Sequence, residues 1–268
     1  MSAHLDHFGF TVEPFTKEID DKDLWLPPSK APLVDELVEA VEARESVVVT
    51  GEPGVGKTCV LRALRHRVSP DRFRLTYCHN ATLGRRDFYR QLCLALGLHP
   101  NATAASVFYA VSSCVEELAK EHLHPVFLLD EAHLLHQDTL DHLHILLNYA
   151  WDSRALLSLI LVGLSDFDVR LKLGRNRSLY SRLHRRLTLE PTTPEDSADY
   201  LRHRARHAGV DRDLFADDAV VLLHEAASGT LRDLDRLAST CLRHAARKKR
   251  KVIDRDIAAR VVKNAERA

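Results

Sequence analysis

The stretch VVVTGEPGVGKTCVL, residues Val47 to Leu61, places a glycine-rich loop between an apolar strand and the start of a helix. Its pattern, G-x-x-x-x-G-K-[ST], is typical of loops whose backbone N–H groups surround the phosphates of a nucleotide. Glycine suits such a loop because a residue without Cβ tolerates positive φ. We expect a strand over Val47 to Thr50 and a helix over Cys59 to Val68, whose N-terminal dipole would face the phosphates. The stretch predicts a site for a nucleoside triphosphate.

Within this loop the chemistry of two side chains predicts separate roles. Lys57 supplies a positive charge for the β- and γ-phosphates, and the Thr58 hydroxyl is predicted to bind Mg²⁺. The expected cofactors are therefore ATP and Mg²⁺. The residues predicted to bind the nucleotide are Gly51, Glu52, Pro53, Gly54, Val55, Gly56, Lys57, Thr58 and Cys59.

A second motif, HPVFLLDEAHLL, contains an apolar run from Val126 to Leu129 that ends in two acids. A strand buried in a parallel sheet reads as continuous hydrophobic residues, and its carboxyl end lies where ligands bind. Asp130 would hold Mg²⁺ together with Thr58, and Glu131 would polarise the attacking water. The alternative is a solvated strand end with no ligand. Together the two motifs predict ATP hydrolysis, an ATPase rather than a simple binder.

Composition fits a folded chain of one large and one small domain. The chain has 268 residues, of which 45% are hydrophobic, and its formal net charge is zero. No uninterrupted apolar stretch is long enough for a membrane span, and the start, MSAHLDHFGF, does not resemble a signal peptide. We expect a cytoplasmic protein with no membrane partner. The five cysteines form no C-x-x-C pair, so we expect them to be buried as small hydrophobic residues.

Charge is unevenly distributed along the chain. Residues 1–50 hold eleven acids and four bases, whereas residues 241–268 hold ten bases and three acids. A basic run from Arg247 to Lys251 could meet the phosphates of a nucleic acid, or it could be a solvated helix end. A second basic stretch, Arg170 to Arg186, contains seven Lys or Arg residues and no acid.

The order of patterns predicts three parts: a lead-in segment over residues 1–45, an α/β domain over 46–190 and a helical lid over 191–268. Thr193 as N-cap, Pro194 in the first turn, and Glu195 and Asp196 near the positive helix end indicate that the lid begins with a helix. Alternating strands and helices imply a parallel sheet covered on both faces. The expected strands are Val47 to Thr50, Arg74 to Cys78, Val126 to Leu129, Leu157 to Val162 and Leu187 to Leu189.

Several stretches resemble the AAA+ ATPases, which are P-loop NTPases with a helix-sandwiched parallel sheet and a small C-terminal helical lid. These stretches are HFGFTVEPF, GEPGVGKT, FLLDEAH, LILVGLSDF, SRLHRRLTLEPTTPED and SGTLRDLDRL. More narrowly, they resemble the group that contains secretion-pathway ATPases of the ExeA kind and transposition-helper ATPases of the TniB and TnsC kind. The resemblance covers nearly the whole chain.

The resemblance implies hydrolysis at a subunit interface, so that a ring or helical filament of identical subunits completes each site. Arg182 falls where the family places its arginine finger, a permanent cation that reaches the γ-phosphate bound by a neighbour. Arg185 and Arg186 lie close enough to leave the choice among the three open. Arg232, after Gly229-Thr230-Leu231, matches the second sensor, although it could also be an exposed arginine paired with a nearby aspartate.

The sequence departs from the family pattern at the first sensor. After the strand LSLILVG, Leu164 stands where related proteins have a polar residue, and leucine cannot donate a hydrogen bond to phosphate or water. Ser165 or Asp166 could take the role if the turn shifts, but an acid beside phosphate would repel it. We therefore expect slow hydrolysis.

Two tryptophans are expected to pack rather than to stack on bases. Trp25 lies in the LWLPPS lead-in, where the resembled superfamily often forms part of its adenine pocket. For Trp151 the sequence indicates only packing.

The resemblance favours a transposition helper that oligomerises on duplex DNA without reading its sequence, selects target DNA, and recruits or stimulates a transposase. Its partners would be duplex DNA, a transposase and a target-selection protein, with nucleoid association when on DNA. A secretion-pathway ATPase would need a membrane anchor, which this chain does not offer, and a nucleotide-switched loader or signalling module is the remaining alternative. The residues expected to contact DNA phosphates are Arg85, Arg86, Lys248, Lys249 and Lys251, and for Arg85 and Arg86 a solvated turn before a helix starting at Asp87 is equally compatible.

Overall fold

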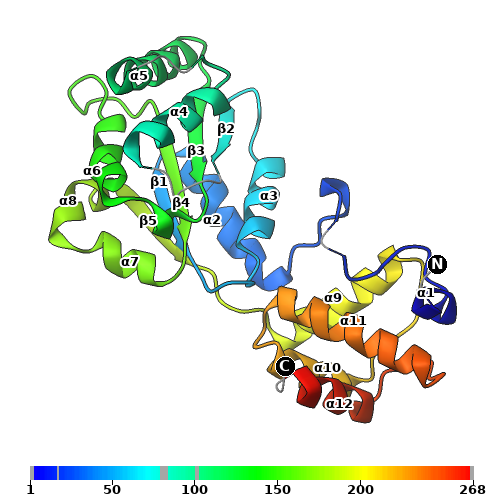
Figure 1. Cartoon of the computed structure of the whole chain (residues 1–268). Coiled ribbons are helices and arrows are strands. Elements are labelled where there is room, and N and C mark those ends of the chain that lie inside the picture. Colours follow the sequence, from blue (N-terminus) through cyan, green and yellow to red (C-terminus); the bar gives the residue numbers. More distant parts are fainter. Residues whose placement is uncertain (1–2, 17, 79–83, 100–102, 266–268) are drawn as a thin grey trace. The chain divides into compact units, whose positions relative to one another are not determined.

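The computed structural model describes residues 3–16, 18–78, 84–99 and 103–265 (Figure 1). Backbone contacts divide the chain into two compact units. The sheet unit comprises Pro32–Glu52 and Ala63–Leu189, and the lid unit comprises Met1–Ala31, Pro53–Arg62 and Glu190–Ala268. Most of the glycine-rich loop, from Pro53 onward, therefore groups with the lid unit, while Gly51, Glu52 and the strand before them belong to the sheet unit.

The sheet unit is built on five parallel strands in the order β2-β3-β4-β1-β5. Their bounds are Ser46–Thr50 (β1), Phe73–Cys78 (β2), His124–Leu129 (β3), Ser158–Gly163 (β4) and Leu183–Thr188 (β5). Every residue of the three inner strands is buried, whereas β2 and β5 at the edges are partly exposed. This matches the chemistry of the strands, because inner strands of a covered parallel sheet are apolar on both faces.

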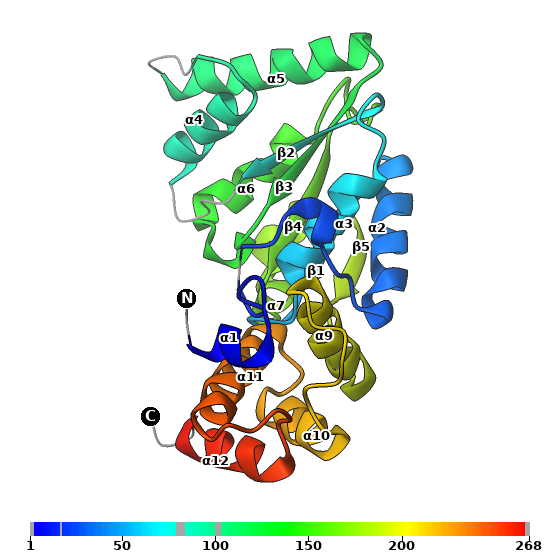
Figure 2. The same ribbon diagram turned by 90° about the vertical axis from the view of Figure 1, so that its right-hand side faces the viewer.

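Helices cover both faces of this sheet, with α2 and α3 on one side and α4, α5 and α6 on the other (Figures 1 and 2). On the second side Phe127, Leu129, Leu159 and Leu161 of the strands join a single apolar core with these helices. The helices are α2 (Ala31–Glu42), α3 (Lys57–Arg67), α4 (Arg85–Ala95), α5 (Ala104–Lys120), α6 (Gln137–Leu146), α7 (Asp166–Leu171) and α8 (Arg177–Tyr180), with short 3₁₀ turns η3 (Ala132–Leu134) and η4 (Gly174–Asn176).

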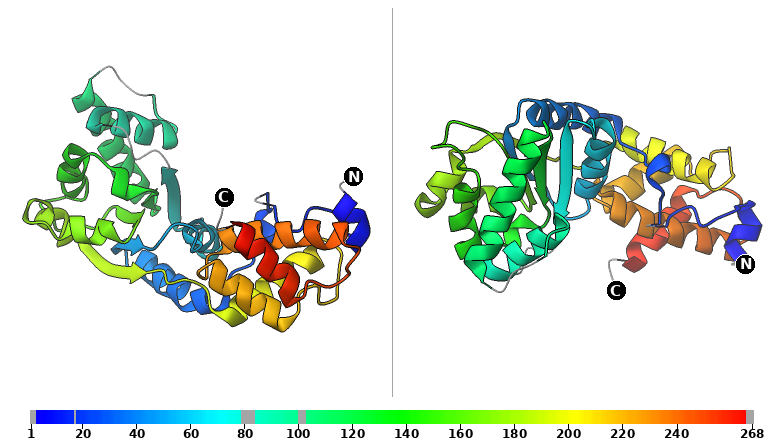
Figure 3. Two further views of the ribbon diagram at one scale, coloured as in Figure 1. Left: turned by 60° about the horizontal axis from the view of Figure 1, so that its bottom comes forward. Right: turned by 90° about the horizontal axis from the view of Figure 1, so that it is seen from above.

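The lid unit is helical (Figures 1 and 3), and its buried side chains form an apolar core of their own. Its helices are α1 (Ala3–Phe8), α9 (Pro194–His207), α10 (Asp217–Ala226), α11 (Leu231–Arg247) and α12 (Arg255–Ala265), and the lead-in adds 3₁₀ turns η1 (Asp21–Asp23) and η2 (Pro28–Lys30). The predicted start of α9 is confirmed: Thr193 is the N-cap, Pro194 follows it, and Thr193 and Asp196 form a reciprocal capping box. Phe8, Phe10 and Phe15 pack into the lid core, which ties the start of the chain to its end.

The predicted fold class, a parallel sheet between helices followed by a helical region, is confirmed. The first four strands match their predictions to within two residues at each end, but the fifth runs from Leu183 to Thr188 rather than from Leu187 to Leu189. The error has a physical cause. As an edge strand, β5 alternates between covered and open positions and includes Arg185 and Arg186, so it lacks the apolar run that marks the inner strands.

Cysteines behave as expected, since Cys78, Cys93, Cys114 and Cys241 are buried and Cys59 is half-buried. Among the described residues, no helix is both long and apolar enough to cross a membrane.

Candidate nucleotide site

The carboxyl ends of the inner strands bring the two predicted motifs to one edge of the sheet. In the register of the strands, Thr50 of β1 pairs with Gly163 of β4, and Leu129 of β3 pairs with Leu161 of β4. The Gly51 N–H continues this edge by donating to the carbonyl of Gly163 at 3.2 Å. Crevices at the carboxyl ends of parallel strands are where open α/β sheets bind ligands.

The loop that follows β1 has the backbone expected of a phosphate cradle. Gly54 and Gly56 adopt φ values of +86° and +102°, in the region that L side chains rarely enter. A Cβ on Gly54 would also lie 3.2 Å from the Thr230 Cβ. Lys57 is the first residue of α3, so the N-terminal end of that helix, with its positive dipole, begins at the predicted site. The helix starts two residues before the predicted Cys59.

Asp130 follows β3 and is buried, with a side chain that accepts two hydrogen bonds. The Tyr77 hydroxyl donates to Oδ2 at 2.8 Å, and the Glu131 N–H donates to Oδ1 at 2.9 Å. Burial, reinforced by this hydrogen bond, raises the pKa of Tyr77, so the phenol keeps its proton and acts as a donor. Each carboxylate oxygen still has a lone pair, so Asp130 can serve as the predicted Mg²⁺ ligand.

Glu131 stands at a sharp bend between β3 and η3. Its φ of 53° is left-handed, and its side chain is half exposed, with Oε2 3.5 Å from the Nδ1 of His133. Backbone in this region costs energy for a residue other than glycine and persists where the surroundings enforce it. The half-exposed carboxylate is accessible to water, as a group that polarises an attacking water must be.

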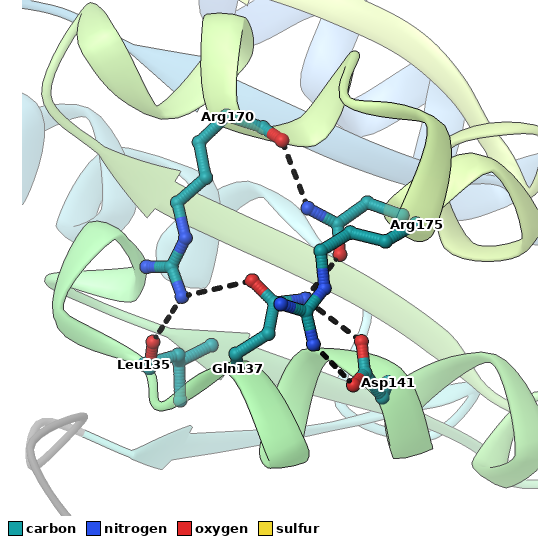
Figure 4. A network of polar contacts seen from close by, with 6 residues as sticks. Leu135, Gln137, Asp141, Arg170 and Arg175 are labelled. Atoms are coloured by element: carbon teal, nitrogen blue, oxygen red, sulfur yellow. Dashed lines mark hydrogen bonds and ion pairs between the residues drawn. The ribbon is translucent and has the colours of Figure 1, made fainter.

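A polar network fastens the segment after Glu131 to α7 and η4 (Figure 4). The half-buried Arg170 guanidinium donates to the carbonyls of His133 at 2.9 Å and Leu135 at 2.7 Å, which lie on either side of the end of η3. Arg170 in turn accepts a hydrogen bond at its own carbonyl from Asn176 Nδ2 at 2.8 Å. Asn176 is the N-cap residue of α8, the helix that leads to Arg182.

The same network continues through Gln137, whose amide nitrogen donates to Asn176 Oδ1 at 2.5 Å and to Asp141 Oδ1 at 2.7 Å. Arg175 closes it by donating to Asp141 Oδ2 at 3.0 Å. Hydrogen bonds from Gln137 and Arg175 lower the pKa of Asp141 and keep it ionised.

At the position predicted for the first sensor, Leu164 directly follows β4 and is half-buried, and Ser165 lies beside Glu52 of the glycine-rich loop. The Ser165 hydroxyl donates to Glu52 Oε1 at 2.7 Å. Ser165 is thus near the predicted loop, but its proton is directed to a loop carboxylate. Asp166 begins α7 and is exposed.

The three candidate finger arginines have different surroundings. Arg182 lies just before β5 and donates to Asp152 Oδ2 at 2.6 Å and to the Ser178 carbonyl at 3.1 Å. Arg185 is bound on β5 by Glu45 and Glu39. The Arg186 guanidinium lies 4.0 Å from the ring centre of Tyr180, a cation–π contact. Arg185 would have to break two carboxylate contacts to act elsewhere, which favours the other two.

The lid unit contains a cavity of about 800 Å³ that reaches the glycine-rich loop. Gly56, Thr58 and Cys59 line it from the loop side, and Arg232 lines it from α11. Ligand pockets for molecules of nucleotide size span roughly 300–1,000 Å³, so the volume suits ATP. Arg232 is exposed, and its Cβ lies 3.5 Å from the Cβ that Gly54 lacks, which places the predicted second sensor against the loop.

Aromatic side chains form the apolar part of this cavity. Trp25 packs on Tyr200 with ring centres 5.3 Å apart, as expected for a packing tryptophan. The Cys59 thiol donates to the Trp25 carbonyl at 3.3 Å, and burial raises the pKa of this thiol to about 11, so it stays protonated. The half-buried Trp25 ring lines the cavity next to the glycine-rich loop, where an aromatic ring suits a purine base.

A buried arginine holds the lead-in against the lid. Arg204 on α9 is only 3% exposed, and its guanidinium donates to the carbonyls of Pro14 at 2.6 Å and Thr16 at 2.7 Å and to the Tyr200 hydroxyl. Tyr200 donates to Asp235 at 2.7 Å. Farther along the lead-in, Arg62 of α3 donates to Asp21 and to the Ile19 carbonyl.

The residues predicted to contact DNA lie on surfaces. Arg85 and Arg86 are exposed in the first turn of α4, which begins at Arg85 rather than at Asp87. Lys248, Lys249 and Lys251 are exposed in the turn after α11, where Lys251 also donates to the carbonyl of His7.

Sequence reasoning missed Tyr77, Arg170 and Arg204. Tyr77 is the one with a usable signal, because it is the next-to-last residue of the strand that neighbours β3. The roles of Arg170 and Arg204 depend on contacts between distant segments, which no local pattern reveals.

Comparisons with known proteins agree with this geometry. The model of a family described as AAA domain matches residues 40–171. No curated protein matches the chain significantly.

Solved structures with the same fold share little sequence with this chain. The Orc1 protein of Aeropyrum pernix in complex with DNA is 20% identical, with 91% of this chain and 67% of that chain covered and a TM-score of 0.65. The ORC2 protein of the same organism, in ADPNP and ADP complexes, is 15% identical (95% and 72% covered, TM-score 0.69). The RuvB Holliday junction branch migration motor of Thermotoga maritima is 16% identical (94% and 73% covered, TM-score 0.60). The chain therefore shares the fold of these structures, a parallel sheet between helices followed by a helical region, and residues 40–171 match the model of the family described as AAA domain.

Proposed function

We propose that this protein is an ATPase that oligomerises on duplex DNA and acts as a transposition helper, selecting target DNA and recruiting or stimulating a transposase. The observation that carries the nucleotide part is the glycine-rich loop with positive φ at Gly54 and Gly56, which opens into a cavity lined by Thr58 and Arg232. The loop N–H groups and Lys57 would hold the phosphates. The rings of Trp25 and Tyr200 would contact the base.

Hydrolysis would use groups at the sheet edge. Thr58 and Asp130 would hold Mg²⁺, which when bound offsets the negative charge of the phosphates. Glu131 would orient and polarise the attacking water, and Arg182 would stabilise charge on the nucleotide of a neighbouring subunit. Because Leu164 has no polar group and Ser165 donates to Glu52, we expect slow turnover.

The proposed binding to DNA rests on the exposed basic side chains of α4 and of the turn after α11. It is also supported by a solved structure of the same fold, the Orc1 protein in complex with DNA. Side chains that neutralise phosphates give affinity that is independent of sequence and falls steeply with salt. A transposition helper would work in the cytoplasm and be associated with the nucleoid while on DNA.

Lys57→Ala tests the nucleotide site. Loss of a charge-assisted contact to phosphate should weaken ATP binding at least about tenfold, measured by titration calorimetry with Mg²⁺ present. Lys172→Ala, which removes an exposed lysine paired with Asp168, is the control and should bind ATP as wild type does. Equal affinity in the Lys57 variant would remove this lysine from the site.

Glu131→Gln separates binding from turnover. The variant should bind ATP normally but release phosphate at least about a hundredfold more slowly, because glutamine is not a base. Turnover near the wild-type rate would assign the water-polarising role to another group.

The DNA and transposition parts need their own experiment. Electron microscopy of protein, duplex DNA and a slowly hydrolysed ATP analogue should show rings or filaments, and the assembled protein should stimulate a transposase encoded beside it. Assemblies on DNA without any effect on such a transposase would favour the loader-like module instead. No assembly with either ligand would contradict both.

A further inference from the structure

A carboxylate lies in the aromatic part of the lid-unit cavity. Asp235 of α11 lines this cavity together with Trp25 and Tyr200 and is half-buried. It follows Arg232 by three positions, so the two side chains lie on one face of the helix. Burial raises the pKa of Asp235 above its ordinary value. Among the described residues no cation is bonded directly to this carboxylate, so hydrogen-bond donors must offset the cost of its burial.

Two hydrogen bonds in series fix the direction in which this carboxylate points. The buried Arg204 guanidinium donates to the Tyr200 hydroxyl at 3.0 Å, and that hydroxyl donates to Asp235 Oδ1 at 2.7 Å. Because arginine has donors only, the hydroxyl accepts from Arg204 and directs its own proton to Asp235. Burial raises the pKa of Tyr200, so the phenol keeps that proton. Of the residues that the structure describes, Tyr200 is the one donor to Asp235, which leaves Oδ2 as an acceptor for a ligand.

Two other aspartates line the described part of the cavity, and their surroundings differ. Asp233 uses both of its carboxylate oxygens within the lid, because Oδ2 accepts from the Thr230 hydroxyl and Oδ1 from Arg236. Asp23 of η1 has its Oδ1 3.9 Å from the ring nitrogen of a lid histidine. Asp235 is the one bonded to a ring that would contact the base. It is therefore the acid placed to meet the edge of a base.

Resting on the proposed nucleotide site, we propose that Asp235 selects the base of the nucleotide. Its Oδ2 accepts a hydrogen bond from the exocyclic amine at the six position of adenine, whose ring lies against Trp25 and Tyr200. A base with a carbonyl at that position presents an acceptor to a carboxylate, so the two oxygens repel each other. Asp235 is thus a specificity-determining residue for ATP.

The bond from Tyr200 also makes the carboxylate a poor partner for guanine. Guanine offers two neighbouring donors, N1–H and the 2-amino group, which match a carboxylate with two open oxygens. Since Tyr200 occupies Oδ1, Asp235 has one open oxygen, and one amine matches it. Arg204, by fixing the direction of the Tyr200 proton, supports the same choice of base.

The first test compares three triphosphates on the wild-type protein by titration calorimetry with Mg²⁺. Purine riboside triphosphate carries hydrogen at the six position, and inosine triphosphate carries a carbonyl there. Loss of one hydrogen bond to a charged group should weaken binding of purine riboside triphosphate about tenfold to a hundredfold relative to ATP. Inosine triphosphate should bind more weakly still, because its carbonyl faces the carboxylate. Equal affinity for ATP and purine riboside triphosphate would overturn the proposal.

The second test is Asp235→Asn, which keeps the size of the side chain and an acceptor for Tyr200 but places an amine donor where Oδ2 stood. The variant should bind ATP about tenfold more weakly and inosine triphosphate about tenfold more tightly than wild type does, so that the preference is reduced or inverted. A residue that only supports the fold would weaken both nucleotides alike. Asp199→Asn, which removes an exposed carboxylate of α9 paired with Arg202, is the matched control and should keep the wild-type preference.

The outcomes separate this inference from the proposed function. If wild type binds none of the triphosphates, the proposed nucleotide site fails. If wild type binds ATP but does not distinguish it from purine riboside triphosphate, base selection by Asp235 is overturned and the nucleotide site stands. If wild type distinguishes them and Asp235→Asn keeps the same preference, another group selects the base and the inference is also overturned. If Asp235→Asn loses its fold by far-UV circular dichroism, the comparison of analogues on wild type decides.

Discussion

Asp130 receives a hydrogen bond on each of its carboxylate oxygens, one from the phenol of Tyr77 on the neighbouring strand and one from the next backbone N–H. A carboxylate fixed in this way presents its remaining lone pairs in one direction. This orientation favours binding of a cation, because the hydrogen-bond partners of a metal-ligating side chain fix the direction in which its oxygens point. At the scale of single residues, Tyr77 is therefore the most informative addition to the predicted site.

Tyr77→Phe removes only the hydroxyl and keeps the ring. Without its donor Asp130 can rotate, so we expect the Mg²⁺ concentration for half-maximal ATP turnover to rise about two- to tenfold, the worth of one hydrogen bond. The measurement is phosphate release over a range of Mg²⁺ concentrations. Tyr109→Phe, which removes an exposed hydroxyl from α5, should leave the curve unchanged. An identical Mg²⁺ curve for Tyr77→Phe would limit that residue to packing.

Single residues also show what the sequence can predict. Local motifs identify Lys57, Thr58, Asp130 and Glu131, because adjacent residue types determine the geometry of a loop and the end of a strand. Tyr77 belongs to no such motif. Its contact with Asp130 depends on the pairing of β2 with β3, which no local sequence pattern predicts.

Between elements, Arg170 is the residue that connects the turn after Glu131 with the segment leading to Arg182. Two carbonyls near η3 accept from its side chain, and the Asn176 amide donates to its backbone. The network drawn in Figure 4 thus links the segment after Glu131 to the N-cap of α8, the helix that precedes Arg182.

Arg170→Ala should lower the turnover number about tenfold or more while leaving the KM for ATP within about twofold, because the variant loosens Glu131 but not the phosphate-binding loop. Arg170→Lys should restore part of the rate, since lysine can reach one carbonyl but not both. Steady-state kinetics of both variants measure the difference.

Arg175→Ala is the matched control. It removes an exposed member of the same network, 57% exposed, whose ion pair with Asp141 is worth little in water, so kinetics should stay close to wild type. If Arg170→Ala changes stability but not the turnover number, the network supports the fold alone.

At the scale of elements, the sequence predicts the inner strands better than the edge strand. The inner strands are buried throughout, and their apolar runs predict their bounds to within two residues. The edge strand β5 includes Arg185 and Arg186, and the predicted strand starts four residues after the observed one. That shift matters for the site, because Arg185 and Arg186 belong to the strand and Arg182 precedes it. The expected packing of Trp151 is wrong, since its side chain is 99% exposed: hydrophobicity favours burial, but the sequence does not show that residues 150–152 form a turn with left-handed φ values.

For the molecule as a whole, one buried histidine links stability to pH. His124 begins β3, is 4% exposed and shares a hydrogen bond of 2.8 Å with the Ser158 hydroxyl of β4. Burial, with a smaller effect of Arg44, lowers the pKa of His124 to about 4 from its usual 6.5. The folded state therefore binds fewer protons than the unfolded state between these two values.

Since the unfolded state binds more protons there, the free energy of unfolding should fall as the pH drops from about 6.5 to about 4. We expect a loss on the order of 2 kcal/mol from this group, measured by urea unfolding at several pH values. His124→Gln keeps a hydrogen-bonding side chain without the titration and should flatten the curve. His66→Gln, at an exposed position, should not; an equally steep curve for His124→Gln would assign the effect to carboxylates.

Strand order has a consequence for the way the protein is made. Ser46 at the start of β1 meets Leu159 of β4, 113 positions later, and the other neighbour of β1 is β5. While the ribosome is still synthesising the middle of the chain, the Val47–Val49 segment has no strand to pair with. Such delayed, long-range pairing slows folding and leaves an adhesive apolar segment open to aggregation. The nascent chain should thus depend on chaperones until β4 and β5 emerge.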